Sequence, residues 1–100
     1  MLILKTLERN AESMHGYAIA RYIKQISGDV LRVEEGSLYP ALQRLLKAGC
    51  VEARWEVSER GRRVRRYELT AEGARRLDHE VSSFERMLEG IRLVLSPNEQ

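Results

Sequence analysis

The feature that most constrains this chain is a run of apolar residues that recur at alternating intervals of four and three from residue 77 to residue 95. This heptad spacing is typical of a helix that packs along one continuous seam. The seam consists of Leu77, Val81, Phe84, Leu88, Ile91 and Leu95. A helix of about 25 residues is roughly 37 Å long, and a small domain covers only its first turns. We therefore expect a second copy of the chain to cover the seam beyond Phe84.

The residues before this seam predict where the long helix begins. Thr70 can accept hydrogen bonds from free N–H groups at a helix N-terminus, and Glu72 in the first turn is favourable beside the positive end of the helix dipole. We expect residues 71–100 to form a dimerisation helix and residues 1–70 to form a domain with its own core.

A second amphipathic helix is predicted from Gly36 or Ser37 to about Ala48. Pro40 lacks a backbone N–H and is tolerated in the first turn of a helix, where Ser37 can cap the free amides. At about 100° per residue, one face of this helix is apolar and carries Leu38, Leu42, Leu45 and Leu46. The opposite face is polar and carries Ser37, Pro40, Gln43, Arg44 and Lys47, with Tyr39 at the margin.

The polar face of this helix has the chemistry of a DNA-reading surface. Gln43 and Arg44 can make paired hydrogen bonds to base edges, whereas Ser37, Tyr39 and Lys47 suit phosphate oxygens. A simple solvated helix face is the alternative, so the flanking segments have to decide between the two.

Two helices are expected before this segment. The first has an apolar face of Leu2, Ile3, Leu4 and Leu7 and ends near Asn10. The second opens near His15 and Gly16 and ends before Gly28, and its expected inward residues are Ile19, Ala20, Ile23 and Ile26. A short connection from Asp29 to Glu35 then leads into the polar-faced helix. This order predicts a helix-turn-helix.

A basic β-hairpin is expected after the polar-faced helix. The apolar Val51, Ala53, Trp55 and Val57 alternate with polar residues, which predicts a half-buried strand with these four side chains on the buried face. A turn lies at residues 58–61, and a second strand runs from about Arg63 to Leu69. The returning arm carries Arg60, Arg62, Arg63, Arg65 and Arg66. Cations this close repel one another, so a polyanionic partner explains them best. The sequence predicts a mainly α fold with a small β-hairpin: a winged helix-turn-helix followed by a long dimerisation helix.

Charge and motif content agree with a nucleic-acid partner and exclude most enzyme classes. Residues 1–70 carry 13 Lys and Arg against 9 Asp and Glu, a net charge of +4, and residues 71–100 carry 4 against 6, a net charge of −2. The sequence has one cysteine, no metal-ligand spacing, no glycine-rich phosphate loop and no nucleophile motif. We expect no catalytic activity, cofactor, metal or membrane span, and a cytoplasmic location.

Three motifs resemble the PadR family of bacterial transcription regulators. They are His15-Gly16-Tyr17, the segment Glu35-Gly36-Ser37-Leu38-Tyr39-Pro40-Ala41-Leu42 with Arg44-Leu45, and Tyr67-Glu68-Leu69-Thr70 with Gly73. The middle motif is the most specific. The resemblance covers nearly the whole chain, and the single C-terminal helix is similar to the short subgroup of the family. Unlike most members, the chain has few residues ahead of its first apolar helix, so it is trimmed there or has a reduced dimer contact.

The resemblance implies a homodimeric repressor that binds a palindromic operator in double-stranded DNA. It implies a DNA-reading helix from Ser37 through Lys47, with Tyr39 on the DNA backbone, and a wing from Arg60 through Arg65. Some short members bind flat aromatic compounds at the dimer centre, so release by a small-molecule effector is an expectation. No residue is assigned to that effector, because Phe84 is the single aromatic residue of the long helix.

A protein-binding module built on the same fold is the alternative, because a fold alone does not determine function. The arginine-rich wing and the exposed side chains expected at Gln43, Arg44 and Lys47 favour DNA. Retention on heparin with steep release by salt distinguishes the two, because a module that binds only protein lacks it.

Overall fold

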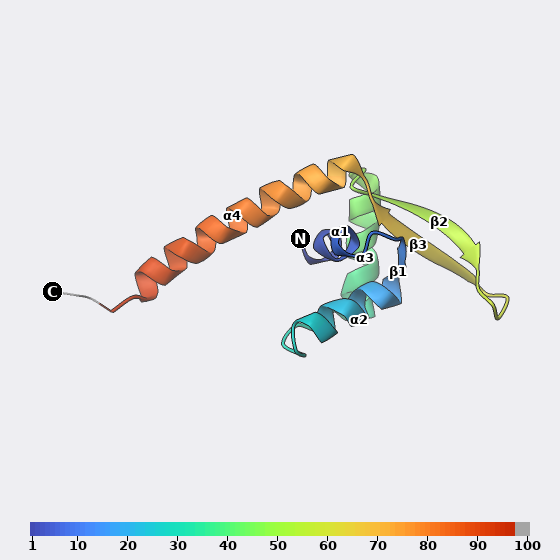
Figure 1. The fold of residues 1–100 in the computed structure, drawn as a ribbon, viewed down its shortest axis with the longest axis horizontal. Helices are drawn as coiled ribbons and strands as arrows, with labels where there is room; N and C mark the ends of the chain where they lie inside the picture. The colour runs from blue at the N-terminus through green and yellow to red at the C-terminus, as the bar shows by residue number, and fades with distance from the viewer. Residues whose placement is uncertain (98–100) are drawn as a thin grey trace.

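The computed structural model describes residues 1–97, so the last three residues of the expected dimerisation helix lie outside the described part. Four helices and three strands make up these 97 residues (Figure 1). They are α1 (Leu2–Arg9), β1 (Met14–His15), α2 (Gly16–Ile26), α3 (Glu35–Lys47), β2 (Val51–Val57), β3 (Arg63–Leu69) and α4 (Ala71–Leu95). The predicted fold class, a mainly α winged helix with a long C-terminal helix, is confirmed.

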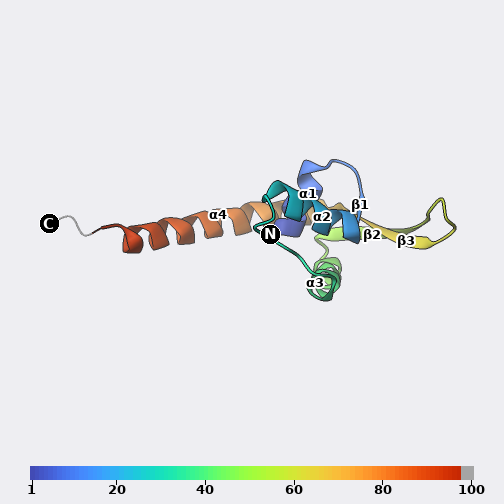
Figure 2. The same ribbon diagram turned by 90° about the horizontal axis from the view of Figure 1, so that it is seen from below.

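Two elements give the molecule its elongated shape of 67 × 28 × 23 Å. The hairpin of β2 and β3 extends from the helical body in one direction, and α4 extends in the opposite direction (Figure 1). Seen from below, α3 lies on one side of the body, away from α1 and α2 (Figure 2). This arrangement leaves one long side of α3 open to solvent.

The three strands form one antiparallel sheet in the order β1-β3-β2. Residues directly opposite each other on β2 and β3 share a face. We call the hairpin of residues 51–69 the wing, and its inner face is formed by the pairs Val51 with Leu69, Ala53 with Tyr67, Trp55 with Arg65, and Val57 with Arg63. The base of this inner face, at Val51 and Tyr67, is buried in the core of the domain.

The core joins all four helices to the base of the wing. Its fully buried apolar side chains are Leu4, Ile19, Leu38, Leu42 and Leu77. They come from α1, α2, α3 and the second turn of α4, and burying a side chain of this size stabilises the fold by about 1.5–3 kcal/mol. The orientation of α3 is therefore fixed by its buried leucines.

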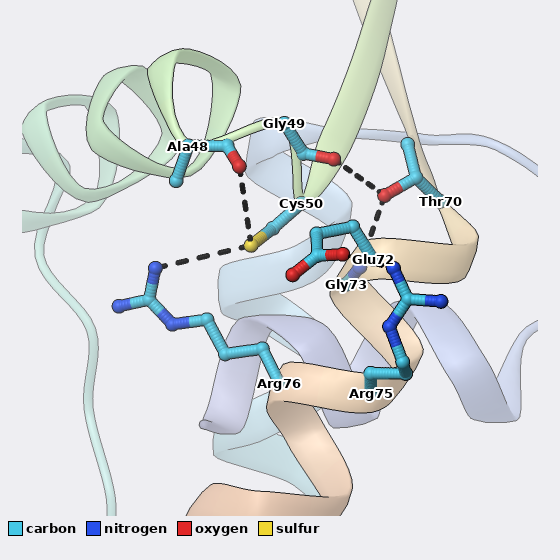
Figure 3. A network of polar contacts seen from close by, with 8 residues as sticks. All are labelled: Ala48, Gly49, Cys50, Thr70, Glu72, Gly73, Arg75 and Arg76. Atoms are coloured by element: carbon cyan, nitrogen blue, oxygen red, sulfur yellow. Dashed lines mark hydrogen bonds and ion pairs between the residues drawn. The ribbon is translucent and has the colours of Figure 1, made fainter.

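A polar junction joins the start of α4 to the end of α3 and the base of the wing (Figure 3). The Thr70 hydroxyl accepts a hydrogen bond from the Gly73 N–H at 3.0 Å and donates one to the Gly49 carbonyl at 2.6 Å. The Thr70 N–H donates to the Cys50 carbonyl at 3.1 Å. The predicted cap of the long helix at Thr70 is confirmed.

An arginine extends this junction towards the N-terminus of the chain. Arg76 donates to the Cys50 sulfur at 3.8 Å (Figure 3) and to a Glu80 carboxylate oxygen at 3.0 Å. These two hydrogen bonds raise the pKa of Arg76 above its ordinary value. Glu80 also lies 3.4 Å from the N-terminal ammonium group of Met1. The first turns of α4 are thus tied to α1 as well as to the wing.

The start of α3 differs from the prediction. The helix begins at Glu35 after an extended Glu34, and no side chain caps it, so the predicted cap at Ser37 is wrong. Pro40 lies inside the helix rather than in its first turn. The missing N–H of Pro40 leaves only the Gly36 carbonyl without its helical partner, and Gly36 is exposed, so water can satisfy it. The acidic Glu35 in the first turn favours the earlier start.

Three predictions of burial are also wrong, and one strand is not predicted by the sequence. Ile26 is 63% exposed because it lies in the last turn of α2, beyond the part of the helix that packs on the body. Trp55 and Val57 are exposed because the wing extends beyond the core. The short strand β1 was not expected: it consists of Met14 and His15, which pair with Tyr67 and Arg66.

Candidate DNA-binding surface

The polar side of α3 is exposed along its length. Tyr39 at its margin is 43% exposed, and the other exposed side chains are Ser37, Pro40, Gln43, Arg44 and Lys47. The leucines of the opposite stripe are part of the core, so the polar side faces away from it. The helix α3 itself lies at the edge of the body (Figure 2). The helix has the basic residues Arg44 and Lys47 in its last turn, where they also complement the negative end of the helix dipole.

The two edges of the polar side of α3 border a cavity and a groove, respectively. Ser37 and Arg44 line a cavity of about 460 Å³ that also contains Met1, Ile23 and Arg76. Tyr39 and Gln43 line a groove of about 440 Å³ between α3 and the wing. The structure therefore brings Tyr39 and Gln43 close to the wing and places Ser37 and Arg44 towards α1 and α4.

Tyr39 is positioned by the start of α2. A Cβ atom at Gly16 would lie 3.0 Å from Cε1 of the Tyr39 ring, which is closer than side chains normally pack. The absence of a side chain at Gly16 therefore lets the Tyr39 ring rest on the backbone of α2. This contact joins the first two motifs of the sequence, His15-Gly16-Tyr17 and the segment that contains Tyr39.

The turn of the wing is ordered by local hydrogen bonds. The Ser58 N–H donates to the Arg62 carbonyl at 2.8 Å, and the Arg62 N–H donates to the Ser58 hydroxyl at 3.2 Å. Gly61 has a φ of 75°, a left-handed conformation that glycine adopts without strain. Arg60 and Arg62 lie in this turn and are exposed at the end of the wing.

The remaining wing arginines lie on opposite faces of the hairpin. Arg63 and Arg65 are on the inner face beside Trp55. Arg66 is on the outer face, where its Nε donates to the Ser13 hydroxyl at 2.8 Å, its Nη2 donates to the Ser13 carbonyl, and its Nη1 lies 3.5 Å from Glu56. The arginine cluster of the sequence is therefore divided, and Arg66 stabilises the fold by holding the segment before β1.

The apolar seam of α4 leaves the body after two turns. Leu77 is buried and Val81 is half-buried, whereas Phe84 is 42% and Leu95 is 76% exposed. Leu88 is half-buried, Ile91 is exposed, and neighbouring Met87 and Val94 are exposed as well. An apolar strip of this length on a projecting helix marks an interaction surface.

A model of the transcriptional regulator PadR-like family matches residues 3–79. The chain belongs to this family. Among curated protein sequences, none matches the chain.

Solved structures agree with this assignment. A transcriptional regulator from Clostridium thermocellum is 24% identical, with a TM-score of 0.85 over 95% of this chain and 90% of that one. A PadR family regulator from Clostridium difficile is 27% identical, with a TM-score of 0.75 over 95% of both chains. PadR of Bacillus subtilis, solved in complex with operator DNA, is 25% identical, with a TM-score of 0.71 over 80% of this chain and 43% of that one.

Two further observations on this PadR-like regulator concern other kinds of site. Within residues 1–97, no group of three or more His, Cys, Asp or Glu side chains is placed to hold a metal ion. None of the helices in the same residues is long and apolar enough to cross a membrane.

Sequence reasoning missed one residue of this surface. The alternation predicts Trp55 on the buried face of the strand, yet Trp55 is 55% exposed and lies beneath Arg63 and Arg65. The sequence does indicate that Trp55 lies beside the arginines. The alternation from Val51 to Val57, together with the position of the turn, places Trp55 opposite Arg65.

Proposed function

We propose that this chain is a homodimeric repressor that binds a palindromic operator in double-stranded DNA. The observation that carries the proposal is the exposed polar side of α3, which stands out from the body beside an arginine-bearing wing (Figure 2). A helix with this composition fits a DNA major groove, with the wing on the adjacent backbone. The family assignment and the operator complex of the Bacillus subtilis relative support the same partner.

We assign different roles to the side chains of α3. Gln43 and Arg44 carry two hydrogen-bonding groups in one plane and discriminate bases, whereas Tyr39 and Lys47 contact phosphates and fix the register. Ser37 lies in the first turn, where its hydroxyl and the free amides of the helix suit a phosphate. Pro40 is exposed between them and offers the DNA an apolar contact. Arg60 and Arg62 at the end of the wing supply affinity that does not depend on sequence.

We propose that residues 71–100 join two copies of the DNA-binding part, residues 1–70. The supporting observation is the exposed seam of α4 beyond Phe84, which a monomer leaves in water. Two DNA-binding parts connected by a helix pair bind as one bivalent molecule, with a high effective concentration for the second contact. We expect a small-molecule effector to release this dimer from DNA, and we assign no residue to its site.

The experiment uses Leu88→Asp, which places a charge in the seam where an unpaired charge is costly. DNA sites are first selected from random sequence with the unaltered protein. We expect the variant to remain folded, to sediment as a monomer, and to lose preference for the selected site over random DNA. It should retain weak, salt-sensitive binding to any duplex. Two half-sites with centres about 34–36 Å apart, or a multiple of this, are expected in the selected DNA.

Ser82→Asp is the matched control, because Ser82 is exposed on α4 and lies outside the seam. It should sediment as a dimer and bind the selected site as the unaltered protein does. A Leu88→Asp protein that still sediments as a dimer contradicts the interface. A monomer that still prefers the selected site contradicts the need for dimerisation, and an unaltered protein that binds no DNA overturns the whole proposal in favour of a protein-binding module.

A further inference from the structure

The inner face of the wing changes character along its length. At the base, Val51 is buried, and the next pair outward consists of the half-buried Ala53 and the buried Tyr67. Beyond them the face consists of Trp55 opposite Arg65 and Val57 opposite Arg63. The outer half of the face thus combines a large exposed aromatic ring with two guanidinium groups.

The two guanidinium groups lie over the same ring. The central carbon of Arg63 is 4.6 Å from the centroid of the Trp55 ring, and that of Arg65 is 5.3 Å away. Arg65 also lies 6.0 Å from the ring centroid of Tyr67. The negative face of an indole ring attracts a cation and offsets the repulsion between neighbouring positive charges. Trp55 therefore restricts two side chains that would otherwise sample many rotamers.

These arginines line the groove of about 440 Å³ that separates the wing from α3. The groove also contains Tyr17, Tyr39 and Gln43, and none of the residues that line it in the described chain is a carboxylate. The Nε of Arg65 and the Nε2 of His15, both in the same lining, are buried without a hydrogen-bond partner among residues 1–97. Neither Arg63 nor Arg65 pairs with a carboxylate among residues 1–97, so their charge is not neutralised within the fold and the groove favours an anion.

We propose that this groove holds one sugar-phosphate strand of the bound DNA, and that Trp55 is the positioning residue that directs Arg63 and Arg65 towards its phosphates. The inference rests on the proposed function and adds to it a site that joins the wing to α3. Side chains that are already ordered lose less conformational entropy when they bind, so the stacked arginines bind phosphate more tightly than free ones.

The first test compares replacements of Trp55 by binding to a short random-sequence duplex. Random DNA suffices because contacts to the backbone do not depend on sequence. Trp55→Leu keeps an apolar side chain and removes the aromatic face, and we expect it to weaken binding by about 5- to 50-fold, since two arginines must then be ordered on binding. Trp55→Tyr keeps an aromatic face and should restore most of the affinity.

The salt dependence separates positioning from direct contact. Trp55→Leu retains both arginines, so the slope of log affinity against log salt should stay unchanged. Arg63→Ala removes a phosphate contact and should flatten that slope by about 0.9. In the Trp55→Leu background, Arg65→Ala should cost less than it does alone, because the two side chains act together. Unfolding by urea is measured for every variant to separate binding from stability.

A second test measures the fluorescence of Trp55, which reports on the groove directly because Trp55 is the single tryptophan of the chain. The random duplex should change the emission of Trp55 and protect it from quenching by iodide, an anion that enters an arginine-lined groove. Binding is followed in parallel by the anisotropy of labelled DNA. Binding without any change in emission or quenching overturns this site and leaves the proposed function intact, whereas no binding at all overturns the proposed function. Equal affinities of Trp55→Leu and Trp55→Tyr refute positioning by the aromatic ring.

Discussion

Replacing Gly73 with alanine tests whether the junction at the start of α4 holds the fold together. A Cβ atom at this position would lie 2.0 Å from the Cys50 carbonyl oxygen and 2.7 Å from a methyl group of Leu69. The first of these atoms is backbone at the base of the wing, so it cannot rotate away as a side chain does. Either α4 or β2 must therefore shift by an ångström or more.

The cost of this shift follows from the contacts at the junction. Overpacking of a tight site costs about 1–3 kcal/mol. A shift of α4 also strains the Thr70 cap, which is worth about 1 kcal/mol, and the hydrogen bond from the Thr70 N–H to Cys50, which is worth about 0.5–1.5 kcal/mol. Alanine is the better helix former by up to about 1 kcal/mol, which offsets part of the loss. We expect Gly73→Ala to lower the free energy of unfolding by about 2–4 kcal/mol.

Gly90 provides the matched control in the same helix. A Cβ atom there meets nothing within 4 Å, so Gly90→Ala should gain about 0.5–1 kcal/mol from helix propensity alone. Urea unfolding followed by circular dichroism measures both variants at one protein concentration, because the stability of the proposed dimer would depend on concentration. If Gly73→Ala proves as stable as Gly90→Ala, the close packing of α4 on Cys50 is refuted.

Two further predictions concern arginines with contrasting roles. Arg44→Ala should reduce the discrimination between bases at one operator position by about 1–3 kcal/mol. Titration of the selected site and of its single-base variants measures this difference. If the affinity falls equally for all DNAs, Arg44 is a phosphate contact instead. Arg66→Ala removes two hydrogen bonds to Ser13 and should lower the free energy of unfolding by about 1–3 kcal/mol. The slope of log affinity against log salt should not change in Arg66→Ala, and a flatter slope would place Arg66 on the DNA.

The parts of the fold that the sequence predicts are those determined by local periodicity. The seam of α4, the leucine stripe of α3 and the strands of the wing follow from repeats of about 3.6 or 2 residues, and each lies where it was expected. Thr70 was predicted as a cap because its role depends only on the residues beside it. The exposure of the polar side of α3 was also predicted, because it follows from the helical period of about 3.6 residues.

Apart from the start of α3, the errors occur where distant segments decide the outcome. Strand β1 exists because Met14 and His15 meet β3, more than 50 residues later, and two residues carry no periodicity of their own. The alternation in β2 predicts which side chains share a face, but it does not show how far the wing extends past the core, so Trp55 and Val57 were wrongly placed. The alternation of β3 separates Arg63 and Arg65 from Arg66, but it does not show that Arg66 stabilises the fold, because its partner Ser13 lies more than 50 residues earlier.

The hydrogen bonds of Thr70 and the close packing of Gly73 fix the direction in which α4 leaves the body (Figure 3). For a helix about 37 Å long, a tilt of about 5° at its start moves its far end by about 3 Å. This displacement is close to the 3.4 Å step between successive base pairs of DNA. In the dimer that we propose, the rigidity of the packing around Gly73 therefore determines how precisely the spacing of two half-sites must match. A rigid start of α4 would prevent the dimer from binding an operator whose half-sites are one base pair too close or too far apart.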